Sequence, residues 1–322
     1  MGINKAERIG RKAVRAANGI INLAVLTTIM LLVSFASYAM WDSDQVYNAA
    51  SAARYEIYKP SAEDGGKSFE ELRAINPEVF SWLTVYGTNI DYPVAQGGDN
   101  MKYVNTNAEG GYSLSGSIFL DSGNSRDFSD FNSIVFGHHM EKQAMFGEIG
   151  LFSDRSYFDA RPHGNLYYGG RDHGLEFFAF VHADAYDGTV FEPGVTGMER
   201  RQAYLDGLLE KAAFTRDIGV TVNDRIVLLS TCSSDSTNGR DILIARITDG
   251  TFEDTFKQDG AGNAGTQPTA DGQSGIWARL PIWLWVALLF LAAIMILLVV
   301  IHHKRRHFRH LEAENENKQK EQ

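Results

Sequence analysis

The chain has 322 residues and a net charge of -10. Between its basic ends, residues 1–16 and 302–322, lie 19 basic and 35 acidic residues, a balance that argues against binding to nucleic acid or to an anionic membrane surface. The only cysteine, Cys232, excludes an intramolecular disulfide, so the folded part must be stabilised by its apolar core.

The first apolar segment, residues 20–39, follows five basic residues: Lys5, Arg8, Arg11, Lys12 and Arg15. About 20 apolar residues span a bilayer as a helix, and the basic flank places the N-terminus in the cytoplasm. A cleaved signal peptide is the alternative, because Ser37-Tyr38-Ala39 has a small-x-small pattern, but the segment is long for one. We therefore predict a cytoplasmic tail over 1–19 and an uncleaved transmembrane helix over 20–40.

A helical linker outside the cell is predicted over residues 41–67. Residues 44–58 favour a helix rising from the membrane, and Asp64-Gly65-Gly66 breaks it. Ser68 and Glu71 have the spacing of a capping box, which predicts a short helix that ends before Asn76-Pro77.

Short apolar or alternating runs, separated by Gly, Asn and Asp clusters, indicate a mainly β domain over residues 68–253. A helix is predicted over 198–213, because apolar residues recur there at helical spacing. Many short strands with few helices favour a closed barrel or a sandwich. The predicted strands are 79–85, 90–94, 117–120, 134–136, 166–168, 175–181, 226–229 and 242–247.

A second transmembrane helix is predicted over residues 277–301, after a Gly-rich and polar linker over 254–276. Tryptophans crowd its first end, and a basic cluster follows it, which places the tail over 302–322 in the cytoplasm. A buried core helix is the alternative, but a long run without a charge before a basic cluster argues against it. Both termini are thus expected inside the cell and the β domain outside.

Three residues at strand ends suggest thiol acyl-transfer chemistry. Cys232 ends one predicted strand, Arg240 begins the next across a polar loop, and His138 ends another. A thiolate nucleophile needs a proton donor or acceptor and a cation or N–H groups for the oxyanion, and a neighbouring cation favours the thiolate. Cys232, His138 and Arg240 have the side chains for these roles in that order.

Each of these residues also has a structural interpretation. A lone cysteine is often an inert packed side chain. His138 has the alternative of capping a strand or facing solvent, and Arg240 that of an ordinary surface charge or an anion binder. A metal site at His138 and His139 lacks any supporting His-x-x-x-His or Cys-x-x-Cys spacing. The remaining histidines of the β domain, His163, His173 and His182, are taken as structural.

The motifs around these residues resemble those of sortases, the cysteine transpeptidases of Gram-positive cell surfaces. Leu229-Ser230-Thr231-Cys232 is similar to the end of the Thr-Leu-x-Thr-Cys motif, and Asn238-Gly239-Arg240 to the placement of the family's arginine. Four further segments resemble class B sortases, and the similarity covers about residues 68–250. They are Gly137-His138-x-Met140 with Met145-Phe146-Gly147, Leu72-Arg73-x-Ile75-Asn76-Pro77-Glu78, Tyr92-Pro93-Val94-x-Gln96-Gly97 and Gly116-Ser117-Ile118-Phe119.

Some positions depart from the class B pattern. Leu228 replaces the first Thr of the cysteine motif and Phe136 replaces a Tyr, while the motif position selects His138 over His139. A C-terminal span is more familiar in the pilin-polymerising class, whose Asp-Pro-Trp lid is not evident here. Protein anchoring and pilus assembly therefore both stay open.

The resemblance implies a closed eight-stranded β-barrel with N-terminal helices and one inserted helix. It implies that Cys232 attacks a Thr–x bond in the C-terminal sorting motif of a secreted protein and holds the acyl group as a thioester. Arg240 would stabilise the oxyanion or hold substrate, and His138 would transfer protons to and from the amines. The acceptor would be an amine of a cell-wall precursor or a pilin, and no cofactor or metal is expected.

Thr231 and Asn105 are predicted to bind substrate from their motif positions. Two alternatives to this function stay open. One is a surface cysteine peptidase that releases product to water. The other is a non-catalytic interaction module anchored in the membrane.

Overall fold

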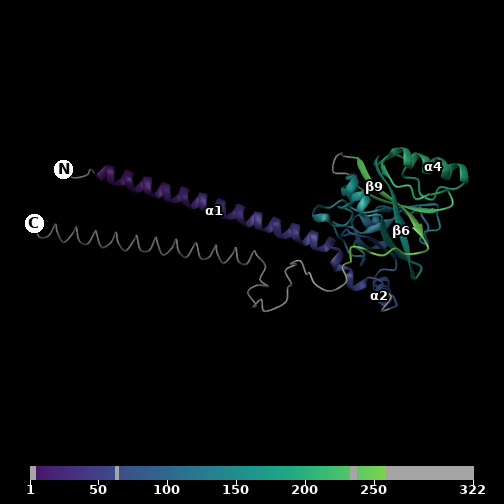
Figure 1. Ribbon diagram of the computed structural model, residues 1–322. Coiled ribbons are helices and arrows are strands. Elements are labelled where there is room, and N and C mark those ends of the chain that lie inside the picture. The colour runs from purple at the N-terminus through teal and green to yellow at the C-terminus, as the bar shows by residue number, and fades with distance from the viewer. Residues whose placement is uncertain (1–4, 62–64, 233–237, 258–322) are drawn as a thin grey trace, which may run out of the picture. The chain divides into compact units, whose positions relative to one another are not determined.

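The computed structural model describes residues 5–61, 65–232 and 238–257 (Figure 1). The described residues from 45 to 257 belong to one compact unit, and the described residues up to 44 belong to a second unit. The predicted second span, 277–301, the tail after it and the predicted linker from residue 258 onward lie outside the described residues.

The first element is one continuous helix, α1 (Lys5–Ala50), where the sequence predicts a span over 20–40 and a separate helix over 44–58. No glycine or proline occurs between residues 20 and 50, so the polar residues after the apolar segment extend the helix instead of ending it. Its stretch from Ile9 to Ala50 is long and apolar enough to cross a membrane, with a mean hydropathy of 2.2 and none of that window buried. Two short 3₁₀ turns follow, at Ala52–Arg54 and Glu56–Tyr58.

The helix α2 (Lys67–Ile75) begins one residue before the predicted capping box. Gly66 is its N-cap residue, with a φ of 78° that favours glycine. The Ser68 hydroxyl donates to the Lys59 carbonyl oxygen at 2.9 Å, so the predicted cap is wrong. The helix does end before Asn76, its C-cap residue, as the following proline predicts.

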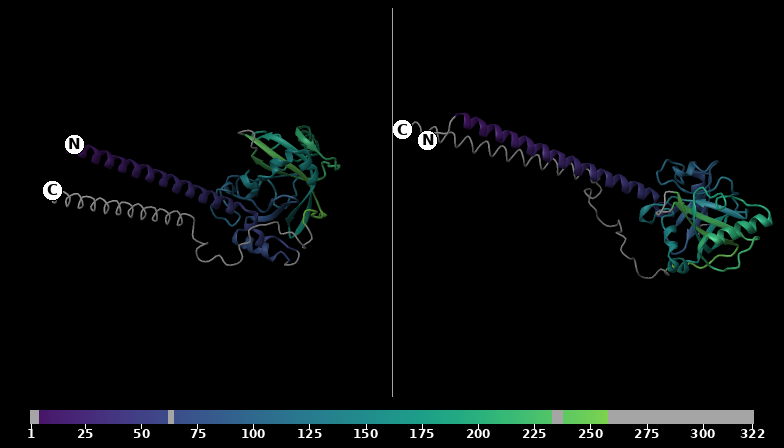
Figure 2. Two further views of the ribbon diagram at one scale, coloured as in Figure 1. Left: turned by 60° about the vertical axis from the view of Figure 1, so that its left-hand side comes forward. Right: turned by 90° about the horizontal axis from the view of Figure 1, so that it is seen from above.

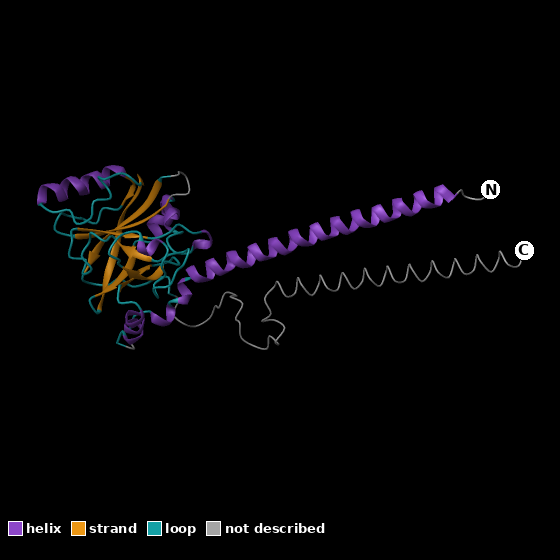
Figure 3. Ribbon diagram, turned by 180° about the vertical axis from the view of Figure 1, so that it is seen from behind, coloured by secondary structure: helices purple, strands orange, loops and turns teal. Residues whose placement is uncertain are grey.

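Eight strands close into a barrel, which confirms the closed form among the two predicted (Figure 1, Figure 3). The order around the ring is β5-β1-β2-β3-β4-β8-β9-β6, and β6 returns to β5. The pairs β2–β3 and β4–β8 are parallel and the others antiparallel. The ring strands are β1 (Val79–Val85), β2 (Asp91–Ala95), β3 (Ile118–Leu120), β4 (Asn132–Phe136), β5 (His163–Tyr168), β6 (Arg171–Asp184), β8 (Arg225–Cys232) and β9 (Gly239–Thr248).

Two elements escape sequence prediction. The strand β7 (Ala212–Thr215) pairs with β6 outside the ring, and α3 (Arg155–Ala160) is a helix of six residues. Because β6 pairs with β5 along its first half and with β7 further on, it is also much longer than the predicted 175–181. The remaining short 3₁₀ turns are η3 (Lys102–Val104), η4 (Glu141–Gln143) and η5 (Ile149–Ser153).

Alternation along β8 and β9 separates two cores. Val227, Leu229 and Leu243 belong to the larger core inside the barrel. Ile226, Leu228, Ile242 and Ile244 face outward and pack with the apolar side of the predicted inserted helix, α4 (Met198–Lys211), which lies outside the sheet in both views (Figure 1, Figure 2). Even-numbered residues of β8 and β9 therefore lie on the outer face.

Candidate active site

Cys232 and Arg240 meet at the end of the β8–β9 hairpin. They are register partners, and Arg240 Nη1 lies 3.0 Å from Cys232 Sγ. Cys232 and Arg240 both have even residue numbers, so both side chains lie on the outer face of the sheet. Cys232 is exposed and Arg240 half-buried. The predicted hairpin therefore places a fixed positive charge against a thiol that solvent reaches.

His138 reaches the same edge of the sheet from β4. In the parallel β4–β8 pair, Phe136 is the partner of Ser230, and the Gly137 N–H donates to the Ser230 carbonyl at 3.1 Å. His138 lies two residues beyond Phe136, as Cys232 lies two beyond Ser230. The three predicted catalytic residues thus share one edge of three neighbouring strands, although His138 lies 94 residues before Cys232 in the sequence.

The His138 imidazole is held by the chain that precedes β3. The Val104 carbonyl at the end of η3 accepts a hydrogen bond from His138 Nε2 at 2.9 Å. Tyr103 anchors this turn, because its buried hydroxyl donates to Glu78 Oε2 at 2.7 Å and accepts from Asn76 Nδ2 at 2.9 Å. The Asn76-Pro77-Glu78 segment after α2 therefore supports the His138 imidazole indirectly, through Tyr103.

The turn that supports His138 is surrounded by an ion pair, Lys102 with Glu78, and by the neutral phenol of Tyr103. Lys102 hydrogen-bonds Glu78 and holds the pKa of that carboxyl below its usual range. Burial raises the pKa of the Tyr103 phenol, which keeps its hydroxyl a donor at neutral pH. The turn that holds His138 is therefore fixed by groups whose ionisation does not change near neutrality.

The two predicted substrate-binding residues differ in their placement. Asn105 is exposed and follows Val104 directly, so it lies beside His138. The Thr231 side chain is 2% exposed and faces the barrel interior, opposite to the Cys232 thiol. This placement argues against contact between the Thr231 hydroxyl and a substrate bound at the thiol.

Ser230 lies on the outer face of β8, the same face as Cys232 and opposite to Thr231. It is two residues before Cys232, is 1% exposed, and its Oγ has no hydrogen-bond partner within the described parts of the chain. Sequence reasoning passed over it, although the period of two in a strand places it on the same side as Cys232.

A second pair was also missed, because its members are 59 residues apart. His182 Nδ1 lies 2.7 Å from Asp241 Oδ1, a carboxylate that is 4% exposed and next to Arg240 in sequence. The pair crosses from β6 to β9 at the same end of the barrel. No group of three or more metal-ligating side chains occurs in the described ranges, and His139 Nδ1 is buried there without a partner.

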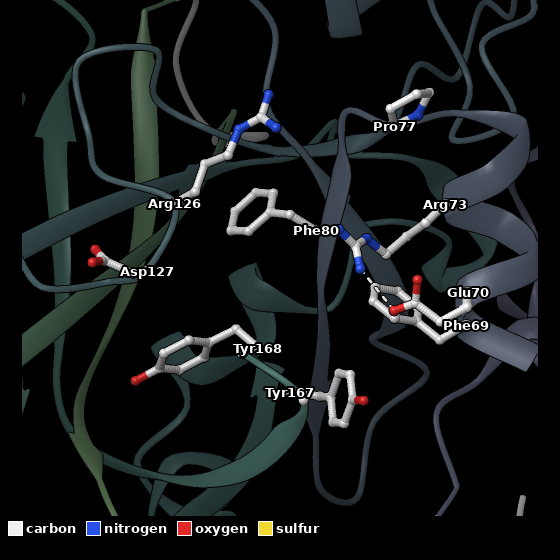
Figure 4. A pocket seen from close by; sticks show the side chains of 11 residues that line it. Phe69, Glu70, Arg73, Pro77, Phe80, Arg126, Asp127, Tyr167 and Tyr168 are labelled. Carbon is white, nitrogen blue, oxygen red and sulfur yellow. Dashed lines mark hydrogen bonds and ion pairs between the residues drawn. The ribbon is translucent and has the colours of Figure 1, made fainter. Parts of the chain in front are cut away.

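A pocket of about 480 Å³ lies at the other end of the barrel (Figure 4). Tyr168, one of its aromatic lining residues, accepts a hydrogen bond from Arg225 Nη1 at 2.8 Å. Arg225 is the first residue of β8 and Cys232 the last. The pocket is therefore separate from the row of Cys232, Arg240 and His138.

No protein-family model matches the chain. Sortase B of Listeria monocytogenes is 30% identical over 179 residues, which are 55% of this chain and 72% of that protein. Sortase B of Staphylococcus aureus is 32% identical over 186 residues, 56% of this chain and 74% of that protein. The chain belongs to the class B sortases. It is therefore a cysteine transpeptidase.

Solved structures agree with this assignment of the sortase. Sortase B from the type II pilus of Streptococcus pneumoniae is 47% identical with a TM-score of 0.51, covering 56% of this chain and 99% of that one. The S. aureus sortase B–substrate complex is 26% identical with a TM-score of 0.58, covering 66% of this chain and 100% of that one. The barrel described above is the sortase fold.

Proposed function

We propose that this sortase cleaves the C-terminal sorting motif of a secreted protein and transfers the acyl group to an amine. The observation that carries the proposal is the contact between Arg240 Nη1 and the exposed Cys232 Sγ at 3.0 Å, in line with His138. A relative of this chain, S. aureus sortase B, has been solved as a complex with a substrate, which supports a substrate-binding role for this sortase too.

Each residue of the row has a distinct role in this reaction. The Cys232 thiolate attacks the scissile carbonyl, and the carbonyl oxygen becomes an oxyanion that Arg240 stabilises. Collapse breaks the C–N bond, leaves a thioester on Sγ, and sends the leaving amine away with a proton from His138. Because Val104 holds Nε2–H, Nδ1 is the nitrogen that exchanges this proton. An incoming amine then attacks the thioester carbonyl and gives its proton to His138; the C–S bond breaks, the new amide forms, and the Cys232 thiolate is released.

Substrate contacts follow from the placement of the neighbouring residues. Asn105 offers an exposed amide beside His138, which suits a hydrogen bond to the backbone of the motif. We keep Thr231 in the groove only through its backbone, since its side chain faces inward.

A pilin lysine is the acceptor that the relatives favour. The S. pneumoniae sortase B comes from a type II pilus, and a Streptococcus pyogenes class B sortase that is 38% identical takes part in pilus biogenesis. A cell-wall precursor amine is the second acceptor to test.

The same proposal includes the membrane. The helix α1 would anchor the chain, residues 277–301 would form a second span, and both tails would lie in the cytoplasm with the barrel outside. The apolar stretch of α1 and its basic flank support the first anchor. The tryptophans and the basic cluster around 277–301 support the second.

The test uses the full chain in detergent with a panel of sorting-motif peptides, and follows the Cys232 adduct by intact mass. We expect an acyl adduct that Cys232→Ala abolishes and that a lysine peptide or an oligoglycine discharges. His138→Ala should slow transfer by about 100-fold or more. His139→Ala is the matched control and should leave transfer nearly unchanged.

Other outcomes would contradict the proposal. Adduct that is discharged only to water, with no transfer to either amine, would indicate a peptidase. A thiol that alkylating reagents reach but no peptide acylates would indicate a non-catalytic module. Equal loss in His138→Ala and His139→Ala would remove the assigned role of His138.

A further inference from the structure

Tyr92 joins two of the segments that resemble class B sortases. Its ring is buried, and its hydroxyl accepts a hydrogen bond from the Met145 N–H at 3.0 Å. Tyr92 belongs to the Tyr-Pro-Val segment on β2, and Met145 to the Met-Phe-Gly segment that follows His138. A single phenol therefore connects segments that are 53 residues apart.

The segment that Tyr92 holds is the loop that begins at His138. The Phe146 N–H donates to the His138 carbonyl at 3.0 Å, and His139 and Met145 form an isolated bridge. The two ends of the loop are therefore paired to each other next to His138. The backbone of this loop is strained, since Lys142, Gln143 and Met145 have φ values of 56°, 60° and 52°. Three left-handed residues without glycine need an outside contact to hold them.

The other partner of the Tyr92 hydroxyl is the end of α1. The hydroxyl donates to the Ala50 carbonyl at 2.9 Å, which satisfies one of the carbonyls that a helix leaves unpaired at its C-terminus. Ala50 itself is fully buried. Burial raises the pKa of the Tyr92 phenol to about 12, so the hydroxyl stays protonated and keeps donating at neutral pH.

Exposed contacts follow the same path from α1 to the loop. The Tyr47 hydroxyl lies 3.2 Å from Glu141 Oε2, and Lys142 Nζ lies 4.3 Å from the centre of the Tyr47 ring. Both contacts join the last turn of α1 to the strained part of the loop. Because they are exposed they contribute little energy, and the buried Tyr92 hydroxyl is the stronger link.

We propose that Tyr92 positions His138 by fastening its loop to the end of α1. The inference rests on the proposed role of His138 as the proton carrier. Tyr92 touches neither the thiol nor the Arg240 guanidinium, so it is a positioning residue and not a catalytic one. The last turn of α1 is then part of the catalytic machinery as well as of the anchor, and a change there reaches His138 through one hydroxyl.

Tyr92→Phe tests this in the full chain, because it removes the hydroxyl and keeps the ring. Tyr168→Phe is the matched control, since it removes a buried hydroxyl that pairs with Arg225 at the other end of the barrel. We expect Tyr92→Phe to lower kcat for transfer by about tenfold or more with little change in KM, because a small displacement of a proton carrier slows the chemical step. Alkylation of Cys232 by iodoacetamide, which needs no proton carrier, should keep its rate. Tyr168→Phe should change neither rate.

Hydrogen exchange of residues 138–147 gives a readout that does not depend on activity. The amides of this loop should exchange at least about tenfold faster in Tyr92→Phe and at the wild-type rate in Tyr168→Phe. Unchanged exchange, or equal loss of kcat in the two variants, would overturn the inference. If the wild type forms no acyl adduct, the proposed function fails, and the exchange measurement still decides whether Tyr92 fastens the loop.

Discussion

At the scale of single residues, the contact between Arg240 and Cys232 shows why an arginine stands here. The guanidinium is planar and presents several N–H donors in a fixed arrangement, so one of them can contact sulfur while others reach an oxyanion. A lysine ammonium has the same charge but a flexible stem and a single centre. Geometry as well as charge therefore decides how the residue at position 240 works.

Substitution of Arg240 separates the two contributions. We expect Arg240→Ala to lower kcat/KM for transfer by about 100-fold or more, and Arg240→Lys by at least about tenfold, because the lysine keeps the charge and loses the donor geometry. Steady-state transfer of a peptide to an amine measures both. Arg200→Lys on α4 is the control, since Arg200 pairs with Glu192 at an exposed position and should be neutral. Full activity of Arg240→Lys would mean that charge alone suffices.

At the scale of elements, the β5–β6 hairpin holds two histidines in their neutral form. His173 is 2% exposed and stacks on Tyr168 at 3.8 Å between ring centres, and His163 stacks on Phe252 at 3.9 Å. Burial is the main cause that lowers the pKa of each. The fold therefore opposes protonation of these two histidines.

The hairpin predicts how stability depends on pH. Unfolded histidine has a pKa of about 6.5, so below that value the unfolded chain binds more protons than the folded chain. The contribution of neutral His173 is complete above about pH 7 and is lost as the pH falls from about 6.5 toward its lower folded pKa. His173→Phe should therefore lose less of its melting temperature between pH 7.5 and pH 5.5 than the wild type does. Tyr168→Phe keeps the histidine and should show the wild-type slope; a wild-type slope in His173→Phe would contradict the assignment.

Sequence patterns predicted the elements that have strong periodicity and missed those set by pairing. The strand β1 has its predicted bounds because it is apolar and ends at turn residues. The strand β7 has four residues and exists because β6 offers it an edge, which no local pattern encodes. The length of α1 was missed for a related reason. Hydropathy marks where a membrane would begin and end, whereas the helical hydrogen bonding continues past the apolar segment to Ala50.

The site was predictable to the extent that its residues lie in motifs. Cys232, His138 and Arg240 were found from strand ends and from resemblance, and the register of β4, β8 and β9 brings them to one edge. Thr231 was chosen by motif position, without regard to the side of the strand that it faces. The His182–Asp241 pair and the double contact of Tyr92 join distant segments, and only the three-dimensional structure shows such contacts.

At the scale of the whole molecule, the proposed topology places basic residues at both ends of the chain on one side of a membrane. The barrel carries the excess of acidic residues and would lie on the other side. The basic flanks and the apolar segments of the sequence therefore both support the proposed topology with two membrane crossings.

Single cysteines test this topology in the Cys232→Ala background. Tyr112→Cys, at a position that is 79% exposed, should react with a membrane-impermeant thiol reagent on intact cells. Gly10→Cys and His310→Cys should react only after the membrane is opened, because both tails are predicted to be cytoplasmic. Labelling of His310→Cys on intact cells would contradict the second membrane span, and α1 would then be the only proposed anchor.

The closed ring also limits how a peptide can be recognised. Every ring strand has a neighbour on each side, and among the described strands β7 alone has a strand neighbour on one side only. An enzyme that handles extended polypeptides risks capturing them by strand addition, because main-chain hydrogen bonds at a free edge give affinity for any extended chain. Closure removes that hazard. Discrimination among passing polypeptides then falls to side chains on the outer face, where a single exchange can change which proteins are accepted.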